Sequence, residues 1–529
     1  MRAFLGLPVA LAACKSSSRT NAIDGRIVGA SNEIGHILRD RRKFEVPVDR
    51  WTDVDTVIVG GGIAGLSAAW SLKRKGFNDF LLLELEERAG GTSASGSSDL
   101  TAYPWGAHYL PVPFAQNTEL VELLDEMRLI ESKDEAGELI IPEQYLTRDP
   151  EERIYHKGRW YEGLYLYAGA SEEDLRQYNA FYSEVGKWIN WRDPEGRRAF
   201  TVPVSSCSTD AEVTALDKIS FAQWLADKGF SSERLEWYCD YACRDDYGRT
   251  LSQTSAWAGL FYFCSRVPAA GEESQSFITF PEGNGRFVDH FVSRIKKNLQ
   301  GSSLVAEVIP GEEGAEVVYI DTKTKQARGI RAKNVIYSAP MFTAGYLIRG
   351  FNDSPPFAAA EFRHNSWFVA NLFLKERPKN RFERDFPLSW DNVLYESPSL
   401  GYVTATHQKG IDYGPTVLTY YYPMAEEDTR LGMQKLLSLD WKELSDICLA
   451  DLERAHENIR EATERIDIMR WGHAMISPKT GFIWGGEREK AMKPFRNIRF
   501  AHSDLSGIAI FEEAFHHGLR AASEIEKTG

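Results

Sequence analysis

One glycine-rich segment limits the folds open to this chain more than any other feature. The β-branched run Thr56–Val59 predicts a buried strand. The chain then enters the pattern G-x-G-x-x-G and a helix-like stretch that closes on a cationic turn before Gly76. A second apolar run, Phe80–Leu83, predicts another strand and places Glu84 at its end. Strand, glycine turn, helix, strand and acid in this order predict a βαβ unit that binds a dinucleotide.

Each part of the glycine turn has a physical task in such a site. Gly60 permits the tight turn, Gly62 lets the backbone approach a pyrophosphate, and Gly65 lets the helix pack closely on the strand. The helix N-terminus offers free N–H groups and its positive dipole end to the phosphates. At the tip of the second strand, Glu84 can accept hydrogen bonds from a ribose diol. The predicted binding residues are therefore Gly60, Gly61, Gly62, Ile63, Ala64, Gly65 and Glu84.

A second glycine pair lies beyond the acid, in the run Glu84-Leu-Glu-Glu-Arg-Ala-Gly-Gly-Thr. This run resembles the E-x(5)-G-G element of the flavin-containing amine oxidase superfamily, which includes polyamine oxidases and phytoene-desaturase-like enzymes. The resemblance implies FAD as the cofactor. It also implies that Arg88, Gly90, Gly91 and Thr92 lie against the phosphates and ribityl chain. Thr92 stands where the family commonly has an arginine.

Three further blocks extend the resemblance along the chain. Gly106 and Ala107 resemble the small residues that the family places beside the flavin ring. His108 next to them is a candidate catalytic residue, and the alternative is a structural histidine, which is the more frequent role of a lone histidine. Val308, in the strand-like run Leu304–Ile309, resembles a valine near the adenine. Asp504, in Phe-Ala-His-Ser-Asp, resembles the acid of the F-A-G-(E/D) motif near the ribityl chain and pyrophosphate.

The substrate pocket is harder to place from sequence. Phe482, which follows Gly481, resembles the end of a family stretch in which an aromatic side chain faces the flavin. Phe482 and Trp471 are predicted to form the pocket floor, and ordinary core packing explains both residues equally well. The tyrosines and tryptophans between residues 131 and 275 suggest a substrate cap or, equally, a plain hydrophobic core.

The departures from the family pattern leave the reaction open. Ile510 occupies the place of a frequent cage tyrosine, and Ile348 and Arg349 occupy the neighbourhood of a lysine that holds a water near the flavin. The C-terminal block has no cysteine, so the resemblance implies non-covalent FAD. An amine oxidase that transfers hydride from a carbon bonded to nitrogen is favoured. The alternatives are a desaturase or isomerase acting on an apolar, isoprenoid-like chain, and a non-catalytic FAD-binding protein.

Length and charge set the remaining limits. A chain of 529 residues is too long for one ordinary domain. The expected fold is α/β, with a Rossmann-like FAD-binding domain and an interleaved α+β substrate domain. A net charge of −14 disfavours nucleic acid as a partner, so a small-molecule substrate is expected. The expected FAD-binding segments are 54–115, 276–345 and 490–529, and the substrate domain takes 116–275 and 346–489.

The N-terminus resembles an export signal. Leu11-Ala-Ala-Cys14 resembles a bacterial lipobox, in which the cysteine is lipidated, and residues 2–6 resemble half of a twin-arginine signal. We therefore expect a signal over 1–14, a tether and extension over 15–53, and an exported, periplasmic or membrane-tethered lipoprotein. The alternative is a cytoplasmic protein with a disordered tail.

Two further patterns complete the expectations. Cys239 and Cys243 share a helix face, but no nearby residue completes a tetrahedral ligand set, so no metal site is expected. The pattern over Leu436–Ile468 predicts mostly helix, and Phe511–Glu526 predicts the last helix.

Overall fold

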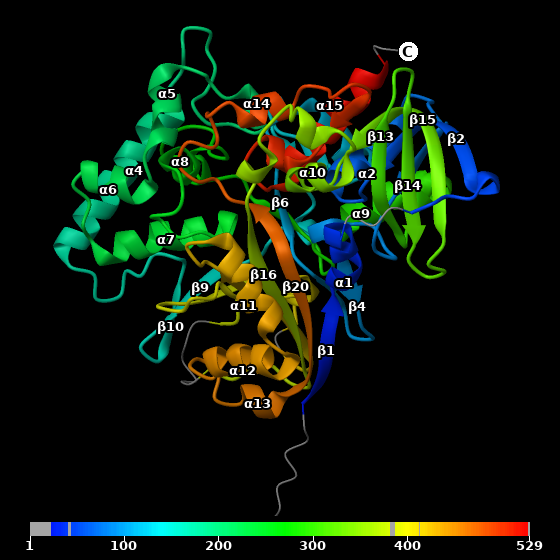
Figure 1. The fold of residues 1–529 in the computed structure, drawn as a ribbon. Coiled ribbons are helices and arrows are strands. Elements are labelled where there is room, and N and C mark those ends of the chain that lie inside the picture. The colour runs from blue at the N-terminus through cyan, green and yellow to red at the C-terminus, as the bar shows by residue number, and fades with distance from the viewer. Residues whose placement is uncertain (1–22, 41–43, 381–386, 412, 527–529) are drawn as a thin grey trace, which may run out of the picture.

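Two large β-sheets organise the chain, as Figure 1 shows. The structure, a computed structural model, describes residues 23–40, 44–380, 387–411 and 413–526. In Figure 1 the first sheet lies at the upper right, and β16 and β20 of the second sheet run down the centre. The helices α4 to α8 gather at the upper left.

The first sheet has a parallel half and an antiparallel half. Within the described residues its order is β12-β3-β2-β15-β14-β13, and β21 also pairs with β15. The strands β12, β3, β2, β15 and β21 are parallel, whereas β13, β14 and β15 form an antiparallel meander. The strand bounds are β2 Trp51–Val59, β3 Phe80–Leu83, β12 Leu299–Gln300, β13 Ser303–Pro310, β14 Ala315–Asp321, β15 Ala327–Tyr337 and β21 Ile498–Phe500.

Burial on both faces explains the apolar run at the end of β2. Val57 lies in register between Leu81 of β3 and Val335 of β15, and it is fully buried. One face is covered by α2 (Ile63–Arg74), α9 (Gly285–Ile295) and α15 (Phe511–Glu526), which pack on one another. The predictions of a Rossmann-like α/β fold and of helix Phe511–Glu526 are confirmed.

The second sheet is mixed, and the segment before the first domain joins it. Its order in the described part of the chain is β1-β20-β16-β19-β18-β17-β9-β10. The edge strand β1 comes from the predicted extension and runs parallel to β20. The bounds are β1 Asp24–Gly29, β9 Glu152–His156, β10 Arg159–Glu162, β16 His364–Leu374, β17 Asp391–Leu394, β18 Gly401–Thr404, β19 Thr416–Met424 and β20 Thr463–Ile476.

The remaining elements connect or cover these sheets. Short pairs are β4 Ser95–Ser97 with β5 Ala102–Pro104, β6 Tyr109–Pro111 with β11 Phe277–Thr279, and β7 Ser132–Lys133 with β8 Leu139–Ile140. The other helices are α1 Asn32–Gly35, α3 Thr118–Glu126, α4 Glu172–Asn190, α5 Ala211–Ala215, α6 Phe221–Asp227, α7 Glu233–Tyr247, α8 Ala256–Cys264, α10 Ala344–Leu347, α11 Thr429–Ser438, α12 Trp441–Leu452, α13 Ile459–Ala462 and α14 Glu487–Ala491.

One predicted helix ends earlier than the sequence pattern indicates. The helices α11, α12 and α13 occupy most of the range before Ala462, but Thr463 begins the long strand β20. Ile466 and Ile468 alternate there with polar residues and are fully buried. The prediction of helix up to Ile468 is therefore wrong for its last six residues, because the chain changes from period 3.6 to period 2 without a glycine or proline between.

No helix among the residues that the structure describes is long and apolar enough to cross a bilayer. The predicted lipidation site, Cys14, lies outside the described residues.

Candidate functional site: a dinucleotide cradle beside a buried acidic cluster

The glycine turn after β2 is too tight for any side chain at two of its positions. Gly60 adopts φ +103°, and a Cβ there would lie 3.0 Å from the Ser338 carbonyl oxygen. A Cβ at Gly65 would lie 2.0 Å from the Gly60 carbonyl oxygen. Ile63 and Ala64 begin α2 and are buried. The backbone therefore packs strand against helix as a dinucleotide turn requires.

The second glycine pair lies directly against the first. The Gly90 N–H donates to the Gly61 carbonyl over 2.8 Å, and a Cβ at Gly91 would lie 3.3 Å from the Gly62 Cα. A Cβ at Gly62 itself would meet nothing within 4 Å. Arg88 is exposed beside this turn. Together Gly62 and Gly91 leave an open backbone cradle at the N-terminus of α2, where a pyrophosphate fits.

Glu84 is oriented by backbone N–H groups from both sides. Its Oε2 accepts from the Gly61 N–H over 2.7 Å, and its Oε1 accepts from the Glu86 N–H over 2.8 Å. Burial raises the pKa of the Glu84 carboxyl to about 7, although these two N–H groups act to lower it. Each carboxyl oxygen keeps a further lone pair for a ribose hydroxyl.

The segment Gly106–Tyr109 connects this cradle to the second sheet. A Cβ at Gly106 would lie 2.3 Å from the Thr92 carbonyl oxygen, which accepts from the Ala107 N–H over 2.9 Å. Burial lowers the pKa of His108 to about 4, although the Gly106 carbonyl near its Nδ1 acts to raise it. His108 is therefore neutral at neutral pH. Its ring lies 4.9 Å from that of Tyr421 and 5.4 Å from that of Trp390, between centroids.

The two predicted floor residues lie in different apolar clusters. The Trp471 indole N–H donates to the Trp105 carbonyl over 2.6 Å, and its ring packs on the cluster that contains Trp390 and Tyr421. Phe482 instead packs in another cluster, with its ring 5.3 Å from Phe362. The structure thus brings Trp471 to the His108 segment and gives Phe482 separate neighbours.

The last two predicted binding residues lie on the first sheet or at its edge. Val308 is fully buried in β13 and pairs with Val317. Asp504 follows β21 and is fully buried, where its Oδ1 lies 2.9 Å from Nε2 of His364. Burial acts to raise the pKa of Asp504, but the imidazoles of His364 and His502 outweigh it and hold that pKa well below its usual range.

A cluster of partly or fully buried acids, which the sequence reasoning missed, lies near Tyr109, the residue after His108. We call Glu152, Asp245, Asp246 and Asp391 the acidic cluster. Glu152 and Asp391 are direct partners in the parallel pair of β9 and β17, so they point to the same face as neighbours. The Tyr241 hydroxyl donates to Asp391 Oδ2 over 3.3 Å.

The acidic cluster holds four carboxyl groups, and burial disfavours the charged form of each. Burial raises the pKa of Asp391 to about 7, and burial followed by neighbouring acids raises the pKa of Asp245 and Glu152 well above the usual range. Arg266 acts against this rise at Asp245 and Asp246. Such an arrangement is suited to bind a cation, since a positive ligand restores the charged form of the acids.

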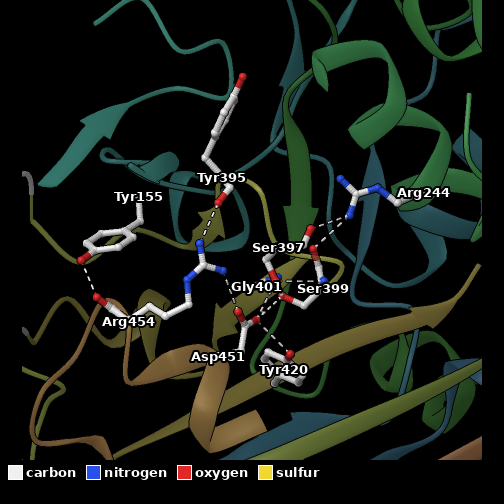
Figure 2. A network of polar contacts seen from close by, with 9 residues as sticks. All are labelled: Tyr155, Arg244, Tyr395, Ser397, Ser399, Gly401, Tyr420, Asp451 and Arg454. Atoms are coloured by element: carbon white, nitrogen blue, oxygen red, sulfur yellow. Dashed lines mark hydrogen bonds and ion pairs between the residues drawn. The ribbon is translucent and has the colours of Figure 1, made fainter. Parts of the chain in front are cut away.

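A polar network fixes the two elements that carry most of these acids (Figure 2). Arg244 of α7 donates from Nη1 to the carbonyl oxygens of Ser397 and Ser399, over 3.0 and 3.3 Å. Asp451 of α12 accepts from both serine hydroxyls and from the Tyr420 hydroxyl. The turn after β17 is therefore held between α7 and α12, which sets how the acids of β17 and α7 face each other.

Comparison with known proteins agrees with this architecture. A family model described as an NAD(P)-binding Rossmann-like domain matches residues 58–127. A solved structure of putrescine oxidase with bound putrescine covers 90% of this chain and 100% of its own, at a TM-score of 0.65 and 17% identity. The protein has the fold of the flavin-containing amine oxidases.

The same amine oxidase fold also occurs with other named activities. A fatty acid isomerase from P. acnes covers 89% of this chain and 98% of its own, at a TM-score of 0.61 and 14% identity. The oxidoreductase PigB of Serratia sp. is 23% identical over 295 residues, which are 52% of this chain and 41% of PigB. The chain thus spans less than half the length of this curated relative, and the shared fold alone does not define a substrate.

The cradle fits FAD as the dinucleotide of an amine oxidase fold. Gly62 is open, Gly91 lies against it, and the Glu84 carboxyl is held at the Gly61 N–H, where it could bond a ribose. Within the described ranges, no group of three or more His, Cys, Asp or Glu residues is arranged to hold a metal ion.

Proposed function

We propose that this protein is an FAD-dependent oxidoreductase that oxidises amines. The observation that carries this proposal is the acidic cluster near Tyr109. Its four carboxyl groups are partly or fully buried, and a positively charged ligand would stabilise their charged form. Among the substrates compatible with the fold, a di- or polyamine matches this site best.

The residues of the cradle would hold the cofactor. Gly60–Gly65 and Gly90–Thr92 would cradle its pyrophosphate, Glu84 its ribose, and Gly106–Ala107 would lie beside its ring. Bound FAD would supply a hydride acceptor for the carbon next to the amine nitrogen and would pass the electrons to oxygen. FAD would be bound without a covalent link, so heat denaturation should release all of it into the supernatant.

The side chains around the acidic cluster would bind and deprotonate the amine. Glu152 and Asp245 would pair with ammonium groups, and the faces of Trp390 and Tyr421 would contribute cation–π attraction. Asp391, with a pKa raised to about 7 by burial, is suited to take the ammonium proton near neutral pH. Neutral His108 adds no repelling charge.

An anaerobic titration tests the proposal. The purified protein is mixed without oxygen with monoamines, diamines and polyamines, and the flavin absorbance is followed. We expect diamines or polyamines to bleach it at lower concentration than monoamines, and peroxide to form when air is admitted. A flavin that no amine bleaches contradicts the proposal, and a protein without flavin contradicts its cofactor basis as well.

One observation favours a second function, a desaturase or isomerase acting on an apolar chain. Phe482 packs on Phe362, and Ile510, which stands where the resemblance expects a cage tyrosine, packs on the same cluster, so this region is apolar. The fold also occurs in a fatty acid isomerase. Altered double bonds without ammonia release would identify this function, and no flavin reduction by any substrate would identify a non-catalytic FAD-binding protein.

We also propose export and lipid anchoring through Cys14, on the strength of the lipobox resemblance. The variant Cys14→Ala should move the protein from the membrane fraction to the soluble fraction of a bacterial host. Equal membrane association of the two proteins would contradict the proposal.

A further inference from the structure

The N-terminal segment, residues 24–39, touches both sheets of the protein. Its strand β1 is an edge of the second sheet and runs parallel to β20. Val28 of this strand packs against the apolar cluster that contains Tyr103 and Trp105, directly before Gly106, which the resemblance places beside the flavin ring. In Figure 1 the segment, in dark blue, runs up beside β20 and reaches the first sheet at α1.

Ser31 connects the segment to the chain that follows strand β3. Its N–H donates to Glu86 Oε1 over 2.9 Å, and its hydroxyl donates to Glu86 Oε2 over 2.7 Å. The Glu86 N–H in turn donates to Glu84 Oε1 over 2.8 Å. A Cβ at Gly35 would lie 3.8 Å from Leu85 Cδ2, so α1 lies on the two residues that follow Glu84. The segment therefore contacts the chain directly beyond the carboxyl proposed for the ribose.

The segment then crosses to the far side of the same sheet edge. After α1, the 3-10 helix His36–Asp40 packs on α10, which follows β15. Leu38 of this turn packs against the core cluster that includes Leu83, at the end of β3, and Met341, after β15. The strands β3, β2 and β15 lie side by side in register between these contacts. Dinucleotides bind across the carboxyl ends of such strands, so the segment passes over the edge at which the cradle lies.

Few contacts hold this segment in place. None of the residues 24–39 is buried, since each is half-buried or exposed. Segments of this kind open locally at a small part of the free energy that global unfolding requires. The two bonds from Ser31 to the Glu86 carboxylate are charge-assisted and therefore stronger than bonds between neutral groups. They stabilise the position of the segment on the first sheet.

We propose that residues 24–39 are a strap that closes over bound FAD, and that the contact between Ser31 and Glu86 holds the strap closed. The dinucleotide then lies between the carboxyl edge of the sheet and the strap, and it leaves only after the strap opens. Such coupling is reciprocal: the closed strap raises the affinity for FAD, and bound FAD favours the closed strap by the same free energy. The inference rests on the proposed flavin function and holds for any substrate.

The variant Ser31→Ala weakens the strap and leaves the cradle intact. The Ser31 hydroxyl donates to Glu86 and does not cap α1, so the variant removes one bond to Glu86 and keeps the N–H bond. The matched control is Ser232→Ala, because the Ser232 hydroxyl also donates to a carboxylate, Asp174 Oδ1, over 2.6 Å, where it joins α7 to α4. Urea unfolding of both apoproteins compares their folding.

Two measurements follow the strap, and neither depends on turnover. The holoprotein is diluted, and the fluorescence of the released FAD gives its dissociation rate. Hydrogen–deuterium exchange of residues 24–39 is recorded with and without FAD. We expect Ser31→Ala to release FAD about tenfold faster than the wild type, and Ser232→Ala to release it at the wild-type rate. We expect bound FAD to slow the exchange of residues 24–39.

A wild-type dissociation rate in folded Ser31→Ala overturns the inference, and so does exchange of residues 24–39 that FAD leaves unchanged. Equal acceleration in both variants also overturns it, because the fold as a whole would then have loosened. If Ser31→Ala does not fold, the exchange of the wild-type residues 24–39 decides alone. A wild-type protein that binds no FAD contradicts the proposed function and the strap together, whereas bound FAD that no amine bleaches contradicts the amine oxidation alone.

Discussion

Gly62→Ala separates cofactor binding from folding more cleanly than any other substitution in the cradle. A Cβ there meets no protein atom within 4 Å, and Gly62 has φ −71°, which alanine adopts without strain. The free energy of unfolding of the apoprotein should therefore change by no more than about 1 kcal/mol. The open space exists for a ligand, so only the ligand should meet the added methyl.

The magnitude follows from geometry. The methyl extends about 1.5 Å from Cα and keeps a phosphate from approaching the N–H groups at the start of α2. A hydrogen bond stretched beyond about 3.5 Å is lost. One or two such bonds to a charged phosphate contribute about 2–5 kcal/mol, which predicts a Kd for FAD about thirtyfold to several thousandfold higher.

Fluorescence titration of apoprotein with FAD measures this effect, and urea unfolding of the apoprotein measures stability. The control is Gly186→Ala in helix α4, where the nearest atom to the new Cβ is Ala270 Cβ at 3.3 Å. A Kd for FAD in Gly62→Ala equal to that of the wild type would refute the proposal that the cradle binds the cofactor. A large loss of apoprotein stability would show that the turn, and not the ligand, needs this glycine.

Three further substitutions test the rest of the structure. Gly518→Ala would place a Cβ 2.3 Å from the Ala64 carbonyl oxygen, so it should lower the free energy of unfolding by about 1–3 kcal/mol. Urea unfolding measures this change, and a variant as stable as the wild type would contradict the close packing of α15 on α2. Asp391→Asn should raise the amine concentration that half-reduces the flavin about tenfold or more, most for diamines, and an unchanged value would remove Asp391 from the substrate site. Burial raises the pKa of Glu513 to about 7, so wild-type stability should fall as pH rises from about 4.5 to 7. Glu513→Gln should make that fall smaller but not remove it, because Glu84 and Asp391 titrate in the same range, and urea unfolding at both pH values measures the difference.

The cofactor cradle could be predicted because its causes are local. Gly60 adopts φ +103°, and a Cβ at Gly65 would lie 2.0 Å from the Gly60 carbonyl oxygen, so the turn itself requires glycine at both positions. The spacing of Gly60 and Gly65 is therefore enough to predict the dinucleotide turn from a few neighbouring residues. The resemblance added the second glycine pair, which the structure places against the first.

The acidic cluster could not be predicted because no local pattern connects its members. Glu152 and Asp391 become neighbours only through the parallel pairing of β9 and β17. Parallel strands need a long crossover, so their partners are far apart in sequence. The adjacent acids Asp245 and Asp246 lie in a helix with many buried residues, and this pair was the feature that could have indicated an acidic site. The same reason hides the contact between His364 and Asp504.

The segment Gly106–Tyr109 determines how cofactor and substrate would meet. Its backbone is bonded on every side: the Ala107 N–H donates to Thr92, and the Tyr421 hydroxyl donates to the Gly106 carbonyl over 2.8 Å. The Thr279 hydroxyl donates to the His108 carbonyl over 2.8 Å. A segment held this way cannot shift without breaking several hydrogen bonds, so its backbone keeps one position relative to the cradle. In the proposed amine oxidase, selection among amines of different length should therefore depend on which acids of the acidic cluster are present.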